Sequence, residues 1–202
     1  FPCHKELSKY EENNISAVRC AGLSMGINFE ELNFGEFPGL SRRNAVLYNS
    51  ETRTVVEDYA HHPTEINAFL SSRRELLPEH ALQVVFQPHR FSRTVALAKK
   101  FAEELSLADD LYLLPTYAAF EKFCVNGSVE SLMGYLPPRL RKRANIYSDF
   151  RSLCNSLAKS SSNSLKDQVL FVGAGDLEKW AHAFASWEMA NGQKLEAFRK
   201  YL

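Results

Sequence analysis

The chain has 202 residues, of which 45% are hydrophobic, and this is enough for one substantial core. Its 24 Lys and Arg residues balance its 24 Asp and Glu residues, so the net charge favours neither nucleic acid nor an anionic membrane as a partner. No apolar run approaches the roughly 18 residues that a membrane span requires.

The four cysteines lack the C-x-x-C spacing of a zinc knuckle or a redox pair. We therefore expect reduced, mostly buried thiols and a cytoplasmic location. The chain begins at Phe1 rather than at an initiating methionine, and we expect it to be a segment of a longer protein.

The first 43 residues differ in composition from the rest. Apolar and small residues recur at helical spacing from Asn14 to Ile27, which predicts a helix ending at Gly26. Residues 29–40 are rich in Phe, Gly and Glu and contain a Pro-Gly turn signal. Because this stretch has too little apolar periodicity for a core, we predict a linker or the tail of another domain over residues 1–43 and a separate domain over residues 44–202.

From residue 44 onward, strand and helix patterns alternate. Apolar and β-branched runs predict strands at Ala45–Tyr48, Thr52–Glu57, Leu82–Gln87, Leu111–Leu114, Ala144–Tyr147 and Gln168–Val172. Helical periodicity predicts helices at Thr64–Leu77, Ser92–Leu107, Val129–Leu136, Phe150–Ser160 and Leu177–Met189. This alternation predicts an α/β fold with a mainly parallel sheet and helices on both faces. The short turn between the first two strands predicts a hairpin, and thus one antiparallel edge.

The segment Glu57–Glu65 carries the strongest functional signal. Its sequence, Glu-Asp-Tyr-Ala-His-His-Pro-Thr-Glu, places acids, a tyrosine and two histidines at the carboxyl end of a strand, just before a helix. Open α/β sheets bind ligands there, because the helix N-terminus offers unpaired N–H groups and a partial positive charge. Adjacent histidines rarely hold one ion without a third ligand, for which His89 is the candidate, and we predict no dedicated metal site.

A second motif, residues 89–94, follows the next strand and therefore lies on the same edge of the sheet. Arg90 and Arg93 are three residues apart in the expected first helical turn, so both guanidinium groups can face one point. A planar guanidinium fork suits a carboxylate or a phosphate. A solvated charged turn is the alternative, and the position beside the first motif favours binding.

Three further segments carry weaker signals. The glycines of residues 173–175 permit close backbone approach and Asp176 is placed to cap the next helix, but one glycine of the dinucleotide fingerprint is missing, which favours a structural turn. Arg42 and Arg43 are candidate phosphate contacts or a solvated pair. The basic run at residues 139–143 is most simply a solvated loop.

Residues 58–65 and 86–94 together resemble motifs of the Mur ligase family. Further matches fall in the same order along the chain, at residues 42–43, 117–121 and 173–176. The resemblance covers nearly the whole chain, and it points to the branch of the family that joins L-alanine to UDP-N-acetylmuramate. The branch that recycles murein tripeptide shares the paired histidines but not the Q-P-H-R-x-[ST]-R-T stretch.

The resemblance implies a place in a three-domain enzyme. The family combines a domain for the UDP-sugar, a central ATPase domain with a P-loop, and a Rossmann-like C-terminal domain, and this chain resembles the third with a tail of the second. The implied activity is that of an ATP-dependent amide ligase of peptidoglycan synthesis. ATP and Mg²⁺ would be bound mainly by the central domain, the partners would be UDP-N-acetylmuramate and L-alanine, and the isolated segment would be inactive.

The resemblance also implies two sets of binding residues, and no catalytic residue within this chain. The substrate-binding set is Tyr59, His61, His89, Arg90 and Arg93. The nucleotide-binding set is Asn14, Arg43 and Asp58. In the first set, the arginines would hold the alanine carboxylate or the developing phosphate, while the tyrosine and the first histidine would shape the pocket for the alanine methyl group. In the second set, the asparagine would contact adenine, the arginine a phosphate and the aspartate the ribose.

The chain departs from the family pattern at several positions. Tyr10-Glu11 replace His-Asn, Asn44 replaces Phe, Phe120 replaces Gly, and an Asp is replaced within Pro115-Thr116. Two alternatives therefore stay open, a diverged non-catalytic binding domain and the murein-tripeptide recycling ligase. A G-T-x-G-K-[ST] loop upstream of Phe1 would favour an enzyme.

Overall fold

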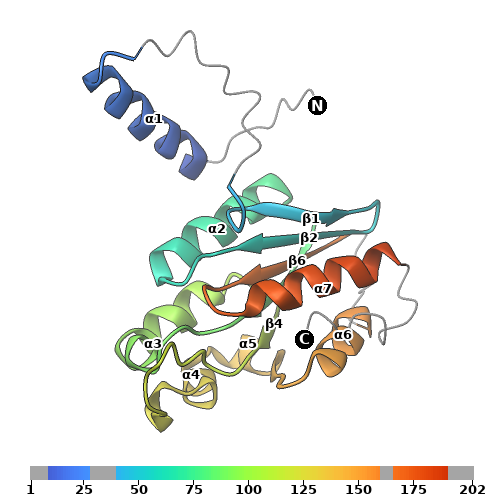
Figure 1. The fold of residues 1–202 in the computed structure, drawn as a ribbon. Coiled ribbons are helices and arrows are strands. Elements are labelled where there is room, and N and C mark those ends of the chain that lie inside the picture. The colour runs from blue at the N-terminus through green and yellow to red at the C-terminus, as the bar shows by residue number, and fades with distance from the viewer. Residues whose placement is uncertain (1–8, 28–39, 160–165, 191–202) are drawn as a thin grey trace.

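The computed structural model describes residues 9–27, 40–159 and 166–190, and the side chains of all of these except residues 9–11. A sheet with helices on both faces dominates the structure (Figure 1). The strands are β1 (Ala45–Asn49), β2 (Arg53–Asp58), β3 (Ala81–Phe86), β4 (Asp110–Leu113), β5 (Ala144–Ile146) and β6 (Asp167–Val172). The helices are α1 (Lys9–Ser24), α2 (Pro63–Leu76), α3 (Phe91–Leu105), α4 (Val129–Tyr135), α5 (Pro138–Arg141), α6 (Phe150–Lys159) and α7 (Leu177–Met189), with a short 3-10 turn, η3 (Val125–Gly127).

The sheet has the order β1-β2-β6-β3-β4-β5. The neighbours β2, β6, β3, β4 and β5 pair in parallel. Strand β1 pairs antiparallel to β2 as the predicted edge hairpin. All six residues of β6 are buried, because the strand lies in the middle of the sheet and is covered on both faces. The predicted α/β class with one antiparallel edge is confirmed.

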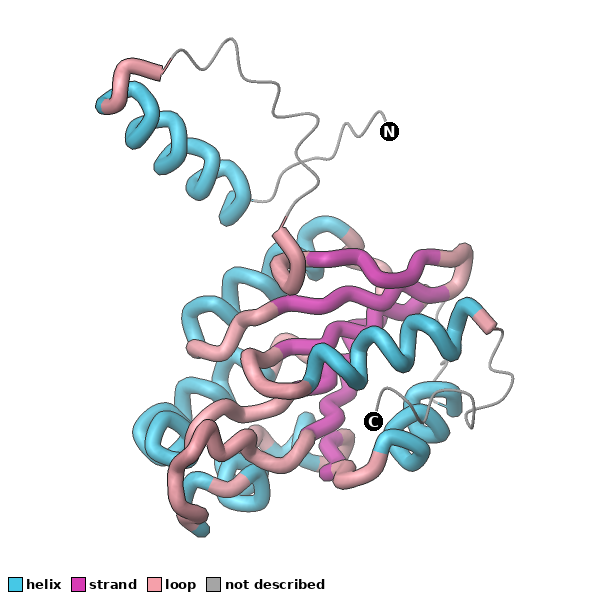
Figure 2. Tube along the Cα trace, in the orientation of Figure 1, coloured by secondary structure: helices cyan, strands magenta, loops and turns pink. Residues whose placement is uncertain are grey.

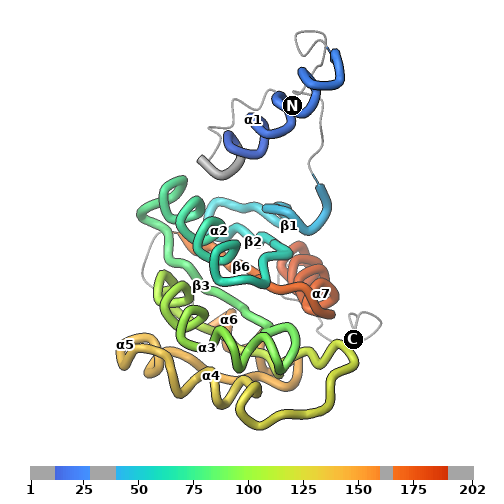
Figure 3. Tube along the Cα trace, turned by 90° about the vertical axis from the view of Figure 1, so that its left-hand side faces the viewer, coloured from blue at the N-terminus to red at the C-terminus, as the bar shows by residue number. Residues whose placement is uncertain are grey.

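Two layers of helices cover the two faces. Alternate residues of the central strands point to opposite sides: Val56 and Leu170 join the core beneath α2, α3 and α4, whereas Val55 and Val169 join the core beneath α6 and α7. Figure 3 shows α2 and α3 on the side of the sheet opposite α7. The loops that follow the parallel strands therefore meet along one edge, the left-hand edge in Figure 2.

The predicted strands and helices of the sheet domain are all present, and their ends differ from the predictions by at most two residues. Residues 139–143 are an exception, because Pro138 starts the short helix α5 in place of the expected solvated loop. The Arg141 guanidinium donates to the Leu136 carbonyl at 2.8 Å, and Arg143 pairs with Asp110 at 2.8 Å. This basic run therefore holds the connection between α4 and β5 in place.

Helix α1 begins at Lys9, well before the predicted start near Asn14. It stands apart from the sheet, near α2 (Figures 1 and 3). Val18 is 52% exposed and Leu23 is 69% exposed, so these apolar side chains are not buried against the other described residues. Residues 29–39, predicted to be irregular, lie outside the described residues, and the division into residues 1–43 and 44–202 stays a prediction.

The cysteines are less buried than expected. Cys154 packs in the core beneath α6 and α7, but Cys20 and Cys124 are exposed. Burial raises the pKa of the Cys154 thiol, so this group behaves as a small apolar side chain. None of the described helices has the length and hydropathy needed to cross a membrane.

Candidate functional site

Four aromatic side chains form a row along the edge where the parallel strands end. Tyr59 and His61 follow β2, His89 follows β3 and Tyr117 follows β4. Neighbouring ring centroids are 5.3 Å apart between Tyr59 and His61, 6.0 Å between His61 and His89, and 5.4 Å between His89 and Tyr117. We call these four residues the aromatic row, and it brings together three of the predicted substrate-binding residues.

The backbone of two loops holds the middle of this row. The Arg90 N–H donates to the Tyr117 carbonyl and the Tyr117 N–H donates to the Pro88 carbonyl, both at 2.8 Å. This pairing extends the ladder between β3 and β4 past the end of the sheet. The His89 and Tyr117 rings are consequently almost parallel, with an interplanar angle of 15°.

Arg93 is the cation that approaches the row at His89. It lies on the first turn of α3, half buried, with Nη1 3.5 Å from Nδ1 of His89. Arg90 differs from the prediction, because it precedes α3 as the N-cap residue, with φ of 74°, and its side chain is exposed. The hydrogen bond from its N–H to Tyr117 draws the Arg90 backbone out of helical conformation. The two guanidinium groups therefore leave the chain from different backbone conformations and do not share one helical turn.

His89 is surrounded by positive charge. Its burial, together with the charges of Arg93, His61 and Arg90, lowers the pKa of His89 below its ordinary value, against an opposing effect of Glu121. The imidazole is therefore neutral at pH 7. A neutral Nδ1 without its proton can accept from Arg93, which positions the guanidinium at the row.

We predict that His89 titrates below pH 6.5, the ordinary value for histidine, when its ring protons are followed by NMR. A pKa lowered in the folded state means that the unfolded chain binds the proton more readily. The contribution of His89 to stability is therefore fully present above about pH 6.5 and is lost as the pH falls through the lower folded-state value. Arg93→Gln should raise the midpoint, whereas Lys100→Gln on the exposed side of α3 should not. A midpoint at or above 6.5 in the unchanged chain would contradict this account.

Arg43 lies at the other end of the row. Its guanidinium carbon is 5.4 Å from the centroid of the Tyr59 ring, and that of Arg42 is 4.7 Å from the same centroid. Cations at such distances are attracted by the aromatic quadrupole. The Arg43 side chain is exposed, so it is the member of this pair that can meet an anionic ligand.

Arg42 hydrogen-bonds β2 and the loop that follows β6. Its Nε donates to Oε1 of Glu57 at 3.0 Å, and its Nη2 donates to the carbonyls of Gly173 and Gly175 at 3.3 and 3.2 Å. A Cβ on Gly175 would lie 2.4 Å from Oε1 of Gln87, so this position excludes a side chain. The expectation that residues 173–175 form a structural turn agrees with this packing. Asp176 is the N-cap residue, but it accepts from Nε2 of Gln87 at 2.8 Å and makes no side-chain cap.

N–H groups at the start of α2, expected to be unpaired, donate to side chains of this chain. Glu65 accepts from the N–H groups of His61 and His62 at 2.9 and 3.2 Å, and the His62 ring accepts from the Thr64 N–H at 3.3 Å. Burial opposes ionisation of Glu65, but these hydrogen bonds and the nearby His61 and Arg43 charges together lower its pKa. A negative charge is therefore already present at this helix N-terminus.

Asp58 is buried at the end of β2. Its carboxylate accepts from the N–H groups of Asn44 at 2.8 Å and Ala60 at 2.7 Å. Burial raises its pKa, and these two hydrogen bonds oppose that rise. Asn44 has φ of 47°, a left-handed conformation that asparagine tolerates better than most residues, which gives a physical reason for asparagine at this position. The ribose contact of Asp58 stays a prediction.

Phe120 is in an unusual position. It has φ of 69° and its side chain is fully exposed, with a relative accessibility of 107%. A bulky side chain in left-handed backbone is strained by roughly 1–2 kcal/mol. The resemblance described above implies Gly at this position, and Gly adopts this conformation without a steric penalty.

We predict that Phe120→Gly raises the free energy of unfolding by about 1 kcal/mol, because it relieves backbone strain and removes no buried contact. Chemical denaturation would measure the change. Lys122→Gly is the matched control, since Lys122 is exposed but has ordinary backbone torsions, and it should destabilise the chain. Equal effects of the two substitutions would contradict the strain argument.

The remaining predicted site residue, Asn14, lies on the exposed surface of α1, and α1 stands apart from the sheet edge (Figure 1). The structure therefore does not bring Asn14 to the aromatic row. Glu121 and Gln87, which the sequence analysis did not single out for these contacts, tie neighbouring loops together. Glu121 accepts from the Ser92 hydroxyl at 2.6 Å and from its N–H at 2.9 Å. Gln87 follows β3, and Tyr117 and Glu121 follow β4. This position after a parallel strand was the sequence signal that could have identified these residues.

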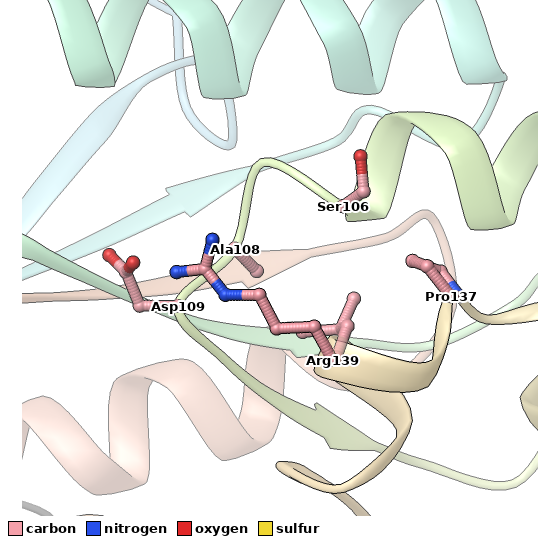
Figure 4. Close-up of a pocket in the computed structure, with 6 residues that line it drawn as sticks. Ser106, Ala108, Asp109, Pro137 and Arg139 are labelled. Carbon is pink, nitrogen blue, oxygen red and sulfur yellow. The ribbon is translucent and has the colours of Figure 1, made fainter.

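A small cavity of about 40 Å³ lies at the opposite edge of the sheet (Figure 4). Ser106, Ala108 and Asp109, which precede β4, form one wall, and Pro137, Arg139 and Leu140 around the start of α5 form the other. It is remote from the aromatic row and takes no part in the candidate site.

The fold defines a Rossmann-like α/β domain, and the candidate site lies at the carboxyl ends of its parallel strands, where open α/β sheets bind ligands. The sequence profile of the family described as "Mur ligase, glutamate ligase domain" matches residues 42–175. The chain therefore belongs to the Mur ligase family.

Individual relatives agree with this assignment. The chain is 34% identical to the UDP-N-acetylmuramate–L-alanine ligase of Endomicrobium trichonymphae over 179 residues, which are 88% of this chain and 38% of that protein. It is 38% identical to the ligase of the same name from Ligilactobacillus salivarius over 148 residues, covering 73% of this chain and 31% of that protein. The crystal structure of the Thermotoga maritima ligase superposes with a TM-score of 0.68 at 28% identity, covering 92% of this chain and 39% of that one. The chain thus spans less than half of the length of these relatives.

Proposed function

We propose that this chain is the C-terminal domain, with a tail of the preceding domain, of an ATP-dependent ligase that joins L-alanine to UDP-N-acetylmuramate. The observation that carries the proposal is the aromatic row with Arg93 beside it, at the edge where α/β domains bind ligands. The identity of 34–38% to relatives with this name supports the same substrates. A cytoplasmic location is part of the proposal, because the reaction consumes ATP.

In the proposed reaction, ATP phosphorylates the muramate carboxylate and ADP leaves. The amine of L-alanine then attacks the acyl phosphate, the amide bond forms, and inorganic phosphate leaves with loss of a proton from the amine. Arg93 and Arg90 would hold the alanine carboxylate or the developing phosphate, and Tyr59 and His61 would confine the methyl group.

The nucleotide side of the proposal concerns Arg43 and Asp58, for a phosphate and the ribose, and Asn14 for adenine. Arg43 is exposed beside Tyr59 and fits a phosphate. Each oxygen of Asp58 accepts one N–H group and keeps a lone pair, with which it would accept from a ribose hydroxyl. ATP and Mg²⁺ would be held mainly by the preceding domain, because Mg²⁺ is usually bound by oxygen ligands together with substrate phosphates.

Two alternatives predict different behaviour. A murein-tripeptide recycling ligase would accept the tripeptide in place of L-alanine, and a diverged binding domain would bind ligand without turnover. The murein peptide ligase of Psychrobacter arcticus superposes with a TM-score of 0.57 at 17% identity, a likeness that concerns the fold alone. The higher identity to the alanine ligases supports the first function.

The test is an assay of the longer protein that contains this chain. We expect phosphate release from ATP that requires both UDP-N-acetylmuramate and L-alanine, with formation of the amide product. We expect the isolated 202-residue chain to be inactive, because phosphoryl transfer needs a phosphate cradle, a lysine and Mg²⁺ ligands. Turnover with tripeptide but not alanine would favour the recycling ligase, and ligand binding without turnover would favour the binding domain.

A further inference from the structure

A second polar cluster lies on the face of the sheet covered by α7. Glu57 comes from β2, whereas Glu178 and His182 lie one helical turn apart on α7. One carboxylate oxygen from each glutamate and one imidazole nitrogen lie within 4.8 Å of one another. The proposed ligase reaction uses none of these three side chains.

Glu57 presents a buried oxygen to this cluster. The residue is 2% exposed, and Oε2 has no hydrogen-bond partner among the described residues. Nε2 of His182 lies 3.3 Å from Oε2, but without hydrogen-bond geometry. Buried polar atoms are nearly always hydrogen-bonded, so an oxygen in this position requires an explanation.

Arg42 accounts for only part of the charge. Its Nε contacts Oε1 of Glu57 at 3.0 Å, and its Nη1 contacts Oε2 of Glu178 at 3.3 Å. One guanidinium thus faces two carboxyl groups, so the acidic side chains of the cluster outnumber its arginine. A guanidinium that grips one oxygen of each carboxylate orients the other, as outer-shell partners do at metal sites.

We propose that Glu57, Glu178 and His182 form a binding site for a divalent cation of the zinc type. Bonds of about 2.0–2.2 Å in a tetrahedral site separate two ligand atoms by about 3.3–3.6 Å. The separation of 3.3 Å between Oε2 of Glu57 and Nε2 of His182 equals such an edge. These two atoms make no hydrogen bond, and their spacing is that of two ligands of one ion.

The ligand types select the class of cation. One imidazole with two carboxylates suits zinc and its neighbours among the first-row transition metals, whereas Mg²⁺ and Ca²⁺ prefer oxygen ligands alone. The side chains of Glu178 and His182 are 47% and 51% exposed, which gives the ion a path from solvent and leaves room for a water as fourth ligand. A bound ion would connect α7 to β2. It would lie beside Arg42, whose guanidinium lies over Tyr59 of the aromatic row.

The test uses the 202-residue chain without a histidine tag, with Cys3, Cys20 and Cys124 changed to Ser so that thiols do not compete for metal. Co²⁺ is added after treatment with chelator, and the visible absorption of four-coordinate Co²⁺ is followed, with displacement by Zn²⁺. Thermal unfolding with and without Zn²⁺ gives a second readout, because a ligand that binds only the folded state raises Tm. The variants are Glu178→Gln and His182→Ala, both at positions exposed enough to leave folding intact, and His61→Ala is the control histidine.

We expect one Co²⁺ per chain, a Tm raised by Zn²⁺, and a loss of at least tenfold in affinity in Glu178→Gln and His182→Ala. His61→Ala should bind as the unchanged chain does. Absence of the visible band, or unchanged binding in His182→Ala, would overturn the proposal and leave an ion pair between Glu57 and His182. Loss of binding in His61→Ala alone would place the metal at the aromatic row and would equally overturn it.

Discussion

Arg93→Ala in the longer protein should lower kcat/KM for L-alanine by about 10- to 150-fold, while ATP binding changes little. A charge-assisted contact from a guanidinium to a carboxylate contributes roughly 1.5–3 kcal/mol, and each 1.4 kcal/mol corresponds to a factor of ten. The structure supports this role because Arg93 is half buried and its Nη1 lies 3.5 Å from His89 in the aromatic row. Steady-state kinetics with each substrate varied in turn would measure the effect.

Two variants make this experiment specific. Arg93→Lys should restore only part of the activity, because an ammonium group cannot reproduce the planar fork. Arg139→Ala removes an exposed arginine at the opposite edge of the sheet, and it should leave both substrates unaffected. If Arg93→Ala raised only the KM for ATP, the residue would belong to the nucleotide side, and if it changed neither constant, Arg93 would be a solvated residue.

Phe101→Ala should lower the free energy of unfolding by about 3–5 kcal/mol, the range observed for truncation of buried aromatic residues. Phe101 is fully buried on α3 and its ring centroid lies 5.6 Å from that of Phe86 on β3. Most domains have only about 5–15 kcal/mol in total, so this loss is a large fraction of their stability. Denaturation by urea, with an unchanged m-value, would measure it.

Val95→Ala is the matched control on the same helix. Val95 is 47% exposed, so its truncation removes little buried surface, and Ala is a better helix former. We expect a change within about 0.5 kcal/mol. A loss below about 1 kcal/mol for Phe101→Ala would mean that α3 does not pack on the sheet as described, since a cavity of this size cannot be filled without cost.

The fold was largely predictable because its signals are local. Apolar runs such as residues 169–172 within β6 identify strands buried on both faces, and helical periodicity identifies the helices between them. The parallel arrangement then places the carboxyl ends of β2 to β6 at one edge. That is why Tyr59, His61 and His89 could be expected in one site although they follow different strands.

Helix ends were less predictable, because they depend on what the neighbouring loops provide. Arg90 was expected in the first turn of α3, but its hydrogen bond to Tyr117 places it outside the helix with φ of 74°. Unpaired N–H groups were also expected before α2, where Glu65 in fact accepts two of them. These hydrogen bonds depend on how the loops are placed in three dimensions, which the hydrophobic periodicity of the sequence does not indicate.

The sequence alone therefore determined the α/β class, the order of its elements and the edge on which the candidate site lies, because hydrophobic periodicity and the alternation of strands with helices are local patterns. Only the tertiary structure decided which partners each polar group has. Arg42 contacts Glu57, Gly173 and Glu178, which are brought together because β2, β6 and α7 pack side by side. The same packing joins Glu57 to His182, a pairing between residues too far apart along the chain for sequence spacing to indicate.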